Sequence, residues 1–368
     1  MDPRIRQHAE VIVEHSLDVQ PGDQVVVSAP NVAEDLVVAL YELLGDVGAN
    51  PINASSPLEI RTNPRASRAY LRARGEDADT PSHYEALFDA ADSFVIVRSH
   101  ENVAEPSDVE PAVQTAAAKA YRSIQDIRLS KPWCLTQFPA GGSAQLAGMS
   151  GEAYENFVWD AVLTDWEEQR EFQAQMVDIM DAGEEVRIVS GETTDVTMSV
   201  AGNRTLNDYG ERNLPGGEVF TAPVPDSVEG EVLFDLPLYR DGREVKNARL
   251  TFENGTVVEH SAEENEAVLT EILNTDDGAR RLGELGIGMN RSIDQFTYNM
   301  LFDEKMGDTV HMAVGNAYGD TVGEGVERNE SAMHVDMIVD MAEESFIEVD
   351  GEVVQRNGTF VFEDGFDA

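Results

Sequence analysis

The chain has 368 residues, 42% of them hydrophobic, which is long enough for two domains with a core each. Seventy acidic residues against 26 basic ones give a net charge of −44, which argues against nucleic acid as a ligand because phosphates would be repelled. No apolar run approaches about 18 residues and the charged N-terminus lacks a signal-peptide core, so we expect a soluble, cytoplasmic protein with no membrane partner.

The first half of the chain alternates strand-like and helix-like segments. Residues 22–30 (GDQVVVSAP) are a continuous apolar run after a Gly-Asp turn, which is typical of a strand buried on both faces. Residues 31–50 follow with leucines at helical spacing, and PINAS at 51–55 predicts the next strand. Residues 84–100 repeat the plan, with a helix leading into SFVIVRS. This order predicts a parallel sheet with helices outside it, and no glycine-rich nucleotide motif accompanies it.

The spacing of apolar residues changes in the second half of the chain. Residues 151–183 predict one long amphipathic helix, after which Val196, Met198 and Val200 alternate as in a strand. Asp-Gly or Asn-Gly pairs interrupt apolar alternations and indicate hairpins at 238–245, 251–262 and 347–362. We therefore predict an N-terminal α/β domain over 1–184 and a C-terminal domain over 185–368 that is mixed and largely antiparallel.

The acidic residues are spread along the whole chain between apolar residues rather than gathered in a tail. Lysine is nearly absent, and Lys119, Lys131, Lys246 and Lys305 are the only ones. Such a surface would repel itself in dilute solution. Because salt at about 1 M shortens the Debye length to about 3 Å, this composition favours a halophilic protein over an acidic protein with a basic partner.

One predicted core strand carries an unexpected pair of polar residues. His334 and Asp336 lie two apart in SAMHVDMIVD, so both would project from one face while Val335 and Met337 point to the core. An imidazole beside a carboxylate is a common way to hold a divalent metal, although a hydrogen-bonded structural pair is the more frequent use of this spacing.

Residues 301–320 strengthen the metal hypothesis. His311 again interrupts a predicted buried strand, and Lys305 stands beside Asp303 and Glu304 in a chain that otherwise avoids lysine. Two further stretches place a carboxylate among small residues, with Glu218 in NLPGGEVFTAP and Glu284 in GARRLGELGIG. Glycines there would let backbone and side chain approach a ligand closely.

Taken in order, these stretches resemble the motifs of the aminopeptidase T and aminopeptidase S family of dinuclear metalloaminopeptidases. The motifs are NLPGGEVFTAPVPDSVEG, GARRLGELGIGMN, NMLFDEKMGDTVHMAVGNAYGD and NESAMHVDMIVD, and VDGEVVQRNGTF resembles the closing hairpin. The resemblance covers most of residues 180–368 and is looser before them.

The resemblance implies two divalent metal ions (Zn, Co or Mn) in the C-terminal domain and a homodimeric protein. It implies metal ligands at Glu218, Glu284, Glu304, His311, His334 and Asp336. Tyr318 matches the active-site tyrosine, and a carboxylate not committed to metal, Glu284 or Glu304, would serve as general base. Carboxylates and imidazoles without thiolates suit such borderline ions.

The leading hypothesis is therefore a metal-dependent aminopeptidase acting on peptides with a free N-terminus. A dipeptidase or amidohydrolase with the same two ions is one alternative, and a non-catalytic metal- or peptide-binding protein is another. Serine and cysteine catalysis lack support, because there is no G-x-S-x-G elbow and Cys134, the single cysteine, has no local signature.

Overall fold

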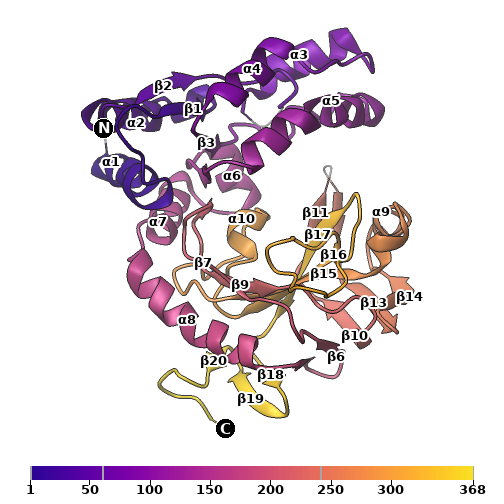
Figure 1. Cartoon of the computed structure of the whole chain (residues 1–368). Helices are drawn as coiled ribbons and strands as arrows, with labels where there is room; N and C mark the ends of the chain where they lie inside the picture. Colours follow the sequence, from indigo (N-terminus) through magenta and orange to yellow (C-terminus); the bar gives the residue numbers. More distant parts are fainter. Residues whose placement is uncertain (1, 60–61, 241–242, 368) are drawn as a thin grey trace. The chain divides into compact units, whose positions relative to one another are not determined.

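The computed structural model describes residues 2–59, 62–240 and 243–367. The chain forms two compact units (Figure 1). The first consists of Met1–Thr164 and Gly210–Gly216, and the second of Asp165–Tyr209 and Gly217–Ala368. The predicted division at 184/185 differs from this one, since the helix Trp166–Ala182 belongs to the second unit.

The first unit contains a parallel sheet with the strand order β2-β1-β3-β4-β8. Val25, Val26 and Val27 of β1 are all buried, so both faces of this strand are covered, as the apolar run at 22–30 predicts. Cys134 is buried in β4. The strands are β1 (Gln24–Ser28), β2 (Asn50–Asn53), β3 (Ser93–Arg98), β4 (Trp133–Gln137) and β8 (Asn213–Leu214).

Helices cover this sheet, and the predicted alternation of strand and helix is confirmed. Phe88 of α4 and Ile124 of α5 pack on Val26 and Phe94 of the sheet. The helices of the first unit are α1 (Pro3–Glu10), continued by a π-helical turn over Val11–Ser16, α2 (Glu34–Val47), α3 (Pro64–Arg74), α4 (Ser82–Ala90), α5 (Pro111–Leu129), α6 (Gly141–Leu146) and α7 (Gly151–Val162). A 3-10 turn over Asn31–Ala33 precedes α2.

The prediction of one long helix over 151–183 is wrong. The segment forms α7, which ends at Val162, and α8 (Trp166–Ala182). The Asp165 carboxylate accepts hydrogen bonds from the N–H groups of Glu167 and Glu168 and so caps the start of α8. A capping aspartate favours a new helix start over continuation of the preceding helix, and the apolar periodicity alone did not reveal it.

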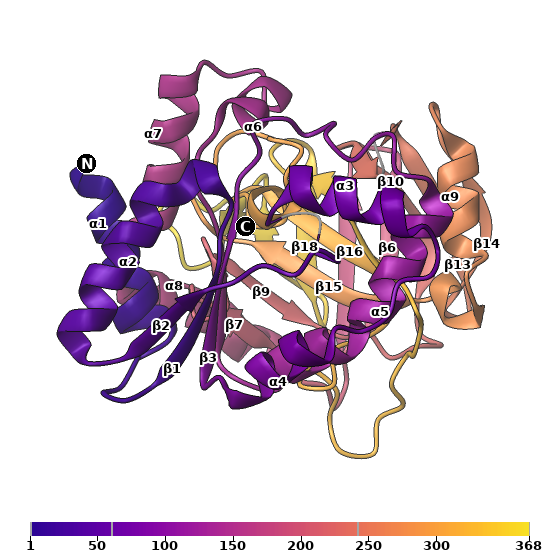
Figure 2. The same ribbon diagram turned by 90° about the horizontal axis from the view of Figure 1, so that it is seen from above.

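The second unit is built mainly from two antiparallel sheets. The larger has the order β14-β13-β10-β6-β5-β18-β19-β20 and the other the order β17-β16-β15-β9-β7. In Figure 2 the strands β9, β15 and β16 lie side by side. The strands of the larger sheet are β5 (Glu185–Ser190), β6 (Thr194–Ser199), β10 (Glu229–Phe234), β13 (Ala248–Glu253), β14 (Thr256–Ser261), β18 (Ser345–Val349), β19 (Glu352–Arg356) and β20 (Thr359–Phe360). Those of the other are β7 (Leu206–Asp208), β9 (Glu218–Thr221), β15 (Leu282–Gly288), β16 (Thr309–Gly315) and β17 (His334–Asp340).

Tight turns join several of these strands as the dipeptide signals predict. Asn254 and Gly255 between β13 and β14 have φ values of 48° and 74°, and Asn357 and Gly358 between β19 and β20 have 48° and 75°. Such left-handed pairs match the twist of hairpins. Asp350 and Gly351 between β18 and β19 likewise have φ values of 50° and 86°. The fourth predicted turn, Asp241-Gly242, lies outside the described residues, but β11 (Leu238–Arg240) and β12 (Arg243–Val245) on either side of it pair antiparallel.

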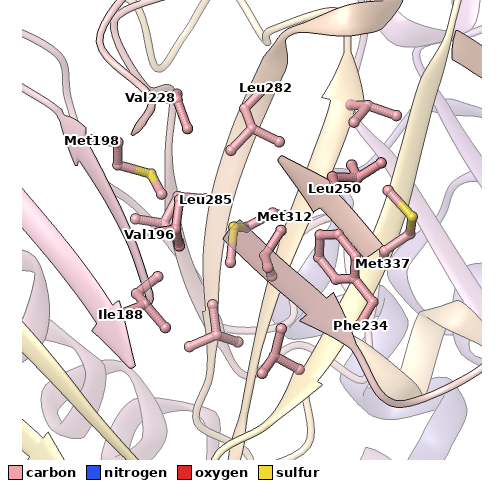
Figure 3. Close-up of a cluster of buried hydrophobic side chains, with 14 of the residues drawn as sticks. Ile188, Val196, Met198, Val228, Phe234, Leu250, Leu282, Leu285, Met312 and Met337 are labelled. Atoms are coloured by element: carbon pink, nitrogen blue, oxygen red, sulfur yellow. The ribbon is translucent and has the colours of Figure 1, made fainter. Parts of the chain in front are cut away.

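The apolar faces of the two sheets meet in the main core of the second unit. Met312 and Met337 of the smaller sheet lie in one cluster with Phe234 and Leu250 of the larger one (Figure 3). This arrangement leaves the opposite face of the smaller sheet available for polar side chains. Two further helices, α9 (Glu266–Leu273) and α10 (Met300–Asp303), and a 3-10 turn (Asp277–Arg280) complete the unit.

None of the helices in the described part of the chain combines the length and the apolar character that a bilayer crossing requires.

Candidate metal centre

The metal candidates lie on the face of the smaller sheet that points away from the core. In β17, Val335 and Met337 are buried in the core cluster, whereas His334 and Asp336 project to the other side, as predicted. The His334 Nε2 atom is 3.4 Å from Asp336 Oδ1. Strand alternation therefore delivers an imidazole and a carboxylate together.

Neighbouring strands add three more candidates to the same face. His311 of β16 is fully buried, and its Nε2 atom is 3.1 Å from Glu218 Oε2 of β9 and 3.3 Å from Glu284 Oε1 of β15. Glu284 Oε2 is 4.0 Å from His334 Nε2. The side chains thus form a continuous chain of contacts, from Glu218 through His311, Glu284 and His334 to Asp336.

Backbone contacts orient one of the imidazoles. His334 Nδ1 lies 2.8 Å from the carbonyl oxygen of Asn316, which accepts a hydrogen bond from an Nδ1–H group. This contact leaves the Nε2 atom facing Asp336 and Glu284. A backbone carbonyl that fixes the tautomer in this way is typical of histidines that bind metal.

A glycine makes room for the other imidazole. Gly286 of β15 stands opposite His311 in the sheet, and a Cβ atom at this position would lie 2.0 Å from His311 Nε2. Only glycine leaves room for the imidazole here. Gly286 of the GELGIG stretch therefore has a specific role beside the cluster.

Glu304 approaches the cluster from a different element. It directly follows α10, which ends at Asp303. The buried Asp303 carboxylate accepts hydrogen bonds from the N–H and hydroxyl groups of Thr297, which precedes the helix, and so ties the two ends of this short segment together. Lys305 is fully buried, donates a hydrogen bond to Glu304 Oε1, and lies 3.0 Å from Glu218 Oε1. Glu304 is thus joined to the cluster through this lysine.

Tyr318 lies at the exposed edge of the cluster. Its ring is 4.8 Å from that of His334 and 6.1 Å from that of Phe220, and 48% of the residue is accessible to solvent. The six predicted ligands and the predicted tyrosine therefore gather at one place in the second unit. Whether each one binds metal or takes part in the reaction remains a prediction.

The charges of the cluster shift the pKa values of its members. Burial disfavours a charged imidazole, but Asp336 and Glu284 outweigh it and raise the pKa of His334 to about 10. Burial also opposes ionisation of Glu218, yet Lys305 and His311 lower the pKa of this carboxyl below its usual value. For Glu304, burial dominates and raises the pKa to about 7. The cluster therefore attracts protons and other cations strongly.

The residues present fit a divalent metal. Ligand atoms of Glu284, His311 and Asp336 all lie within 4.8 Å of one another. The buried Glu284 Oε2 atom has no hydrogen-bond partner within the described ranges, which is costly for a carboxylate unless a cation satisfies it. Nitrogen and oxygen donors without thiolate suit zinc, cobalt or manganese.

The sequence did not predict two supporting residues. Asp208 of β7 stands opposite Glu218, and its Oδ2 atom is 3.8 Å from Lys305 Nζ. The fully buried amide of Gln173 on α8 donates a hydrogen bond to the backbone carbonyl of Glu218 at 2.9 Å. Neither residue lies in a motif, so only the strand register and the helix packing reveal them.

Comparison with known proteins gives consistent matches over nearly the whole chain. The family model described as thermophilic metalloprotease (M29) matches residues 1–366. The chain is 28% identical to aminopeptidase AmpS of Bacillus subtilis, with 98% of each chain covered, and 28% identical to aminopeptidase T of Thermus aquaticus, with 93% of each covered. The solved structure of AmpT from Thermus thermophilus superposes with a TM-score of 0.84 at 26% identity, covering 98% of this chain and 99% of that one.

Proposed function

The chain belongs to the M29 family of metalloproteases and is a metal-dependent aminopeptidase, and from this premise we propose that the cluster described above is its active site. One observation carries the proposal: ligand atoms from three different strands, on Glu284, His311 and Asp336, lie within 4.8 Å of one another on the polar face of one sheet. We propose Glu218, Glu304 and His334 as the remaining ligands, because each contacts this group directly or through Lys305.

Charge balance favours two ions. With both imidazoles neutral, as metal binding requires, five carboxylates and one ammonium would give the cluster a net charge of about −4. Two divalent cations would neutralise this charge, whereas a single one would leave the excess buried. The carboxylates are those of Asp208, Glu218, Glu284, Glu304 and Asp336, and the ammonium is that of Lys305. When bound, such ions would lower the pKa of the attacking water and polarise the scissile carbonyl.

The side chains of this protein would perform the remaining tasks. Tyr318 is placed beside His334 and open to solvent, so its hydroxyl can donate a hydrogen bond to the oxyanion of the tetrahedral intermediate. Glu284 or Glu304 would accept a proton from the attacking water and pass it to the leaving amine. Glu284 lies between the two histidines, whereas Glu304 pairs with Lys305.

A free N-terminus also suits such a site. The lone pair of a free α-amino group could serve as a ligand to a bound divalent ion, whereas an N-acylated nitrogen has no such lone pair to offer. We therefore expect hydrolysis of the N-terminal residue only, rather than of internal amide bonds.

The test is a pair of substrates that differ only at the N-terminus. Leucine anilide should be hydrolysed, N-acetyl-leucine anilide should not, and a chelator should abolish the activity until cobalt or zinc is returned. Equal hydrolysis of both anilides would rule out recognition of the α-amino group. Activity that survives complete removal of metal would rule out the metal centre.

We further propose that the protein works in concentrated salt, because a net charge of −44 with only four lysines requires screening. Its unfolding temperature should rise between 0.1 M and 2 M KCl, and a constant value would contradict this. By the same family resemblance we propose a homodimer, which light scattering in high salt can test. A cytoplasmic location and the absence of nucleic-acid partners stay predictions of the sequence.

A further inference from the structure

Lys305 occupies an unusual position beneath the proposed ligands. Its side chain has no solvent exposure, and its ammonium contacts three carboxylates. The Nζ atom is 3.0 Å from Glu218 Oε1 and 3.8 Å from Asp208 Oδ2, and it donates a hydrogen bond to Glu304 Oε1.

The other lysines have different environments. Lys246 pairs at the surface with Glu264, and Lys131 donates hydrogen bonds to backbone carbonyls, among them that of Phe88. Among the described residues, Lys305 is the only lysine that is fully buried. The carboxylates of Glu218 and Glu304 lie in direct contact with its ammonium and compensate its burial. A buried charge of this kind is retained only where partners compensate its desolvation.

Two hydrogen bonds fix the backbone of Lys305. The Lys305 carbonyl accepts a hydrogen bond of 3.0 Å from the N–H of Asn290, and the Lys305 N–H donates one of 2.9 Å to Phe302. A Cβ atom on Gly288 of β15 would lie 2.0 Å from the Met306 carbonyl oxygen. Glycine at 288 therefore lets the segment that carries Lys305 press directly on the sheet.

The two oxygens of Glu218 have separate partners. Oε1 faces Lys305, and Oε2 lies 3.1 Å from His311 Nε2, the same nitrogen that Glu284 approaches. Holding Oε1 on the ammonium thus turns Oε2 toward the rest of the cluster. We propose that Lys305 is a positioning residue of the metal centre, whose ammonium holds Glu218 and Glu304 in the orientation that binds metal. This inference rests on the proposed function, because it requires the cluster to bind metal.

The direction in which metal affinity changes on removal of Lys305 distinguishes a positioning role from simple repulsion of cations. If Lys305 only repelled incoming cations, its removal would tighten metal binding. If Lys305 positions the ligands, its removal weakens metal binding, as for outer partners of other metal sites, where the loss is about 10–100-fold.

The experiment measures the zinc affinity of the full chain by competition with a chromophoric chelator. Lys305→Met should bind zinc about 10–100-fold more weakly than wild type. The matched control Lys246→Met removes an exposed lysine of the same unit and should bind as wild type does. A Lys305→Met affinity equal to or tighter than that of wild type would overturn the inference, and circular dichroism confirms that the variant is folded.

Two further variants keep the test decisive if Lys305→Met does not fold. Lys305→Gln retains an N–H donor without the charge, and Asp208→Asn removes one of the three carboxylates that hold the ammonium. Both should weaken zinc binding, and wild-type affinity in either would overturn the inference. If the wild-type protein binds no zinc, the proposed metal centre is wrong. If the wild type binds zinc and these variants bind it equally well, only the proposed role of Lys305 is wrong.

Discussion

Gly286→Ala is a small substitution with a large expected effect. The added Cβ atom would lie 2.0 Å from His311 Nε2, whereas ordinary contacts begin near 3.4 Å, so the ring must move by about 1.4 Å. Overpacking of this kind typically costs about 1–3 kcal/mol of stability. Displacing a group at a catalytic site by about 1 Å can cost about 100-fold in rate. We therefore expect a folded protein with weakened metal binding and at least a ~100-fold lower kcat.

The assay is hydrolysis of an unblocked amino-acid anilide at saturating cobalt, with metal content measured on the same samples. Gly45→Ala is the matched control, because Gly45 lies within helix α2 with no atom within 4 Å of its added Cβ. The control should keep full activity and gain about 0.5–1 kcal/mol of stability. Gly286→Ala with wild-type activity and metal content would refute the placement of His311 in the site.

Three further predictions concern single side chains. His334→Ala should weaken zinc binding more than ~100-fold and abolish activity in a folded protein, whereas His260→Ala, on a partly exposed histidine bonded to a threonine, should change neither. Of Glu284→Gln and Glu304→Gln, the one that keeps its metal but loses kcat identifies the general base, and two variants with wild-type kcat would exclude both. Burial lowers the pKa of His8 to about 3 from 6.5, so the unfolded state binds the proton first and stability falls as the pH drops below about 6.5. Chemical denaturation should show a loss of ~2 kcal/mol between pH 7 and pH 5 that His8→Gln lacks, and an equal loss in the variant would contradict the assignment.

The sequence predicted the structure best in strands, where successive side chains alternate between the two faces of the sheet. Val335 and Met337 had to enter a core, so His334 and Asp336 had to project from the other face, and they do. The same rule covers His311 between the buried Val310 and Met312. Local patterns thus predicted the strands that carry three of the six candidate ligands, His311, His334 and Asp336.

What the sequence could not show depends on neighbours in space. The role of Gly286 follows only from its register with His311. Asp208 ends a strand of three residues, which is too short for any periodicity, and it reaches the cluster because it pairs with Glu218. The break at Asp165 separates two helices whose apolar spacing continues across it, so a single capping residue decided the boundary.

Anomalous diffraction at the zinc edge, from crystals grown with the metal, tests the central claim most directly. Two peaks about 3.5–4 Å apart, among Glu218, Glu284, His311, His334 and Asp336, are the predicted result. Two outcomes would contradict a dinuclear centre on this face of the sheet. One is that all zinc peaks lie elsewhere in the protein, and the other is a single ion that these side chains do not contact.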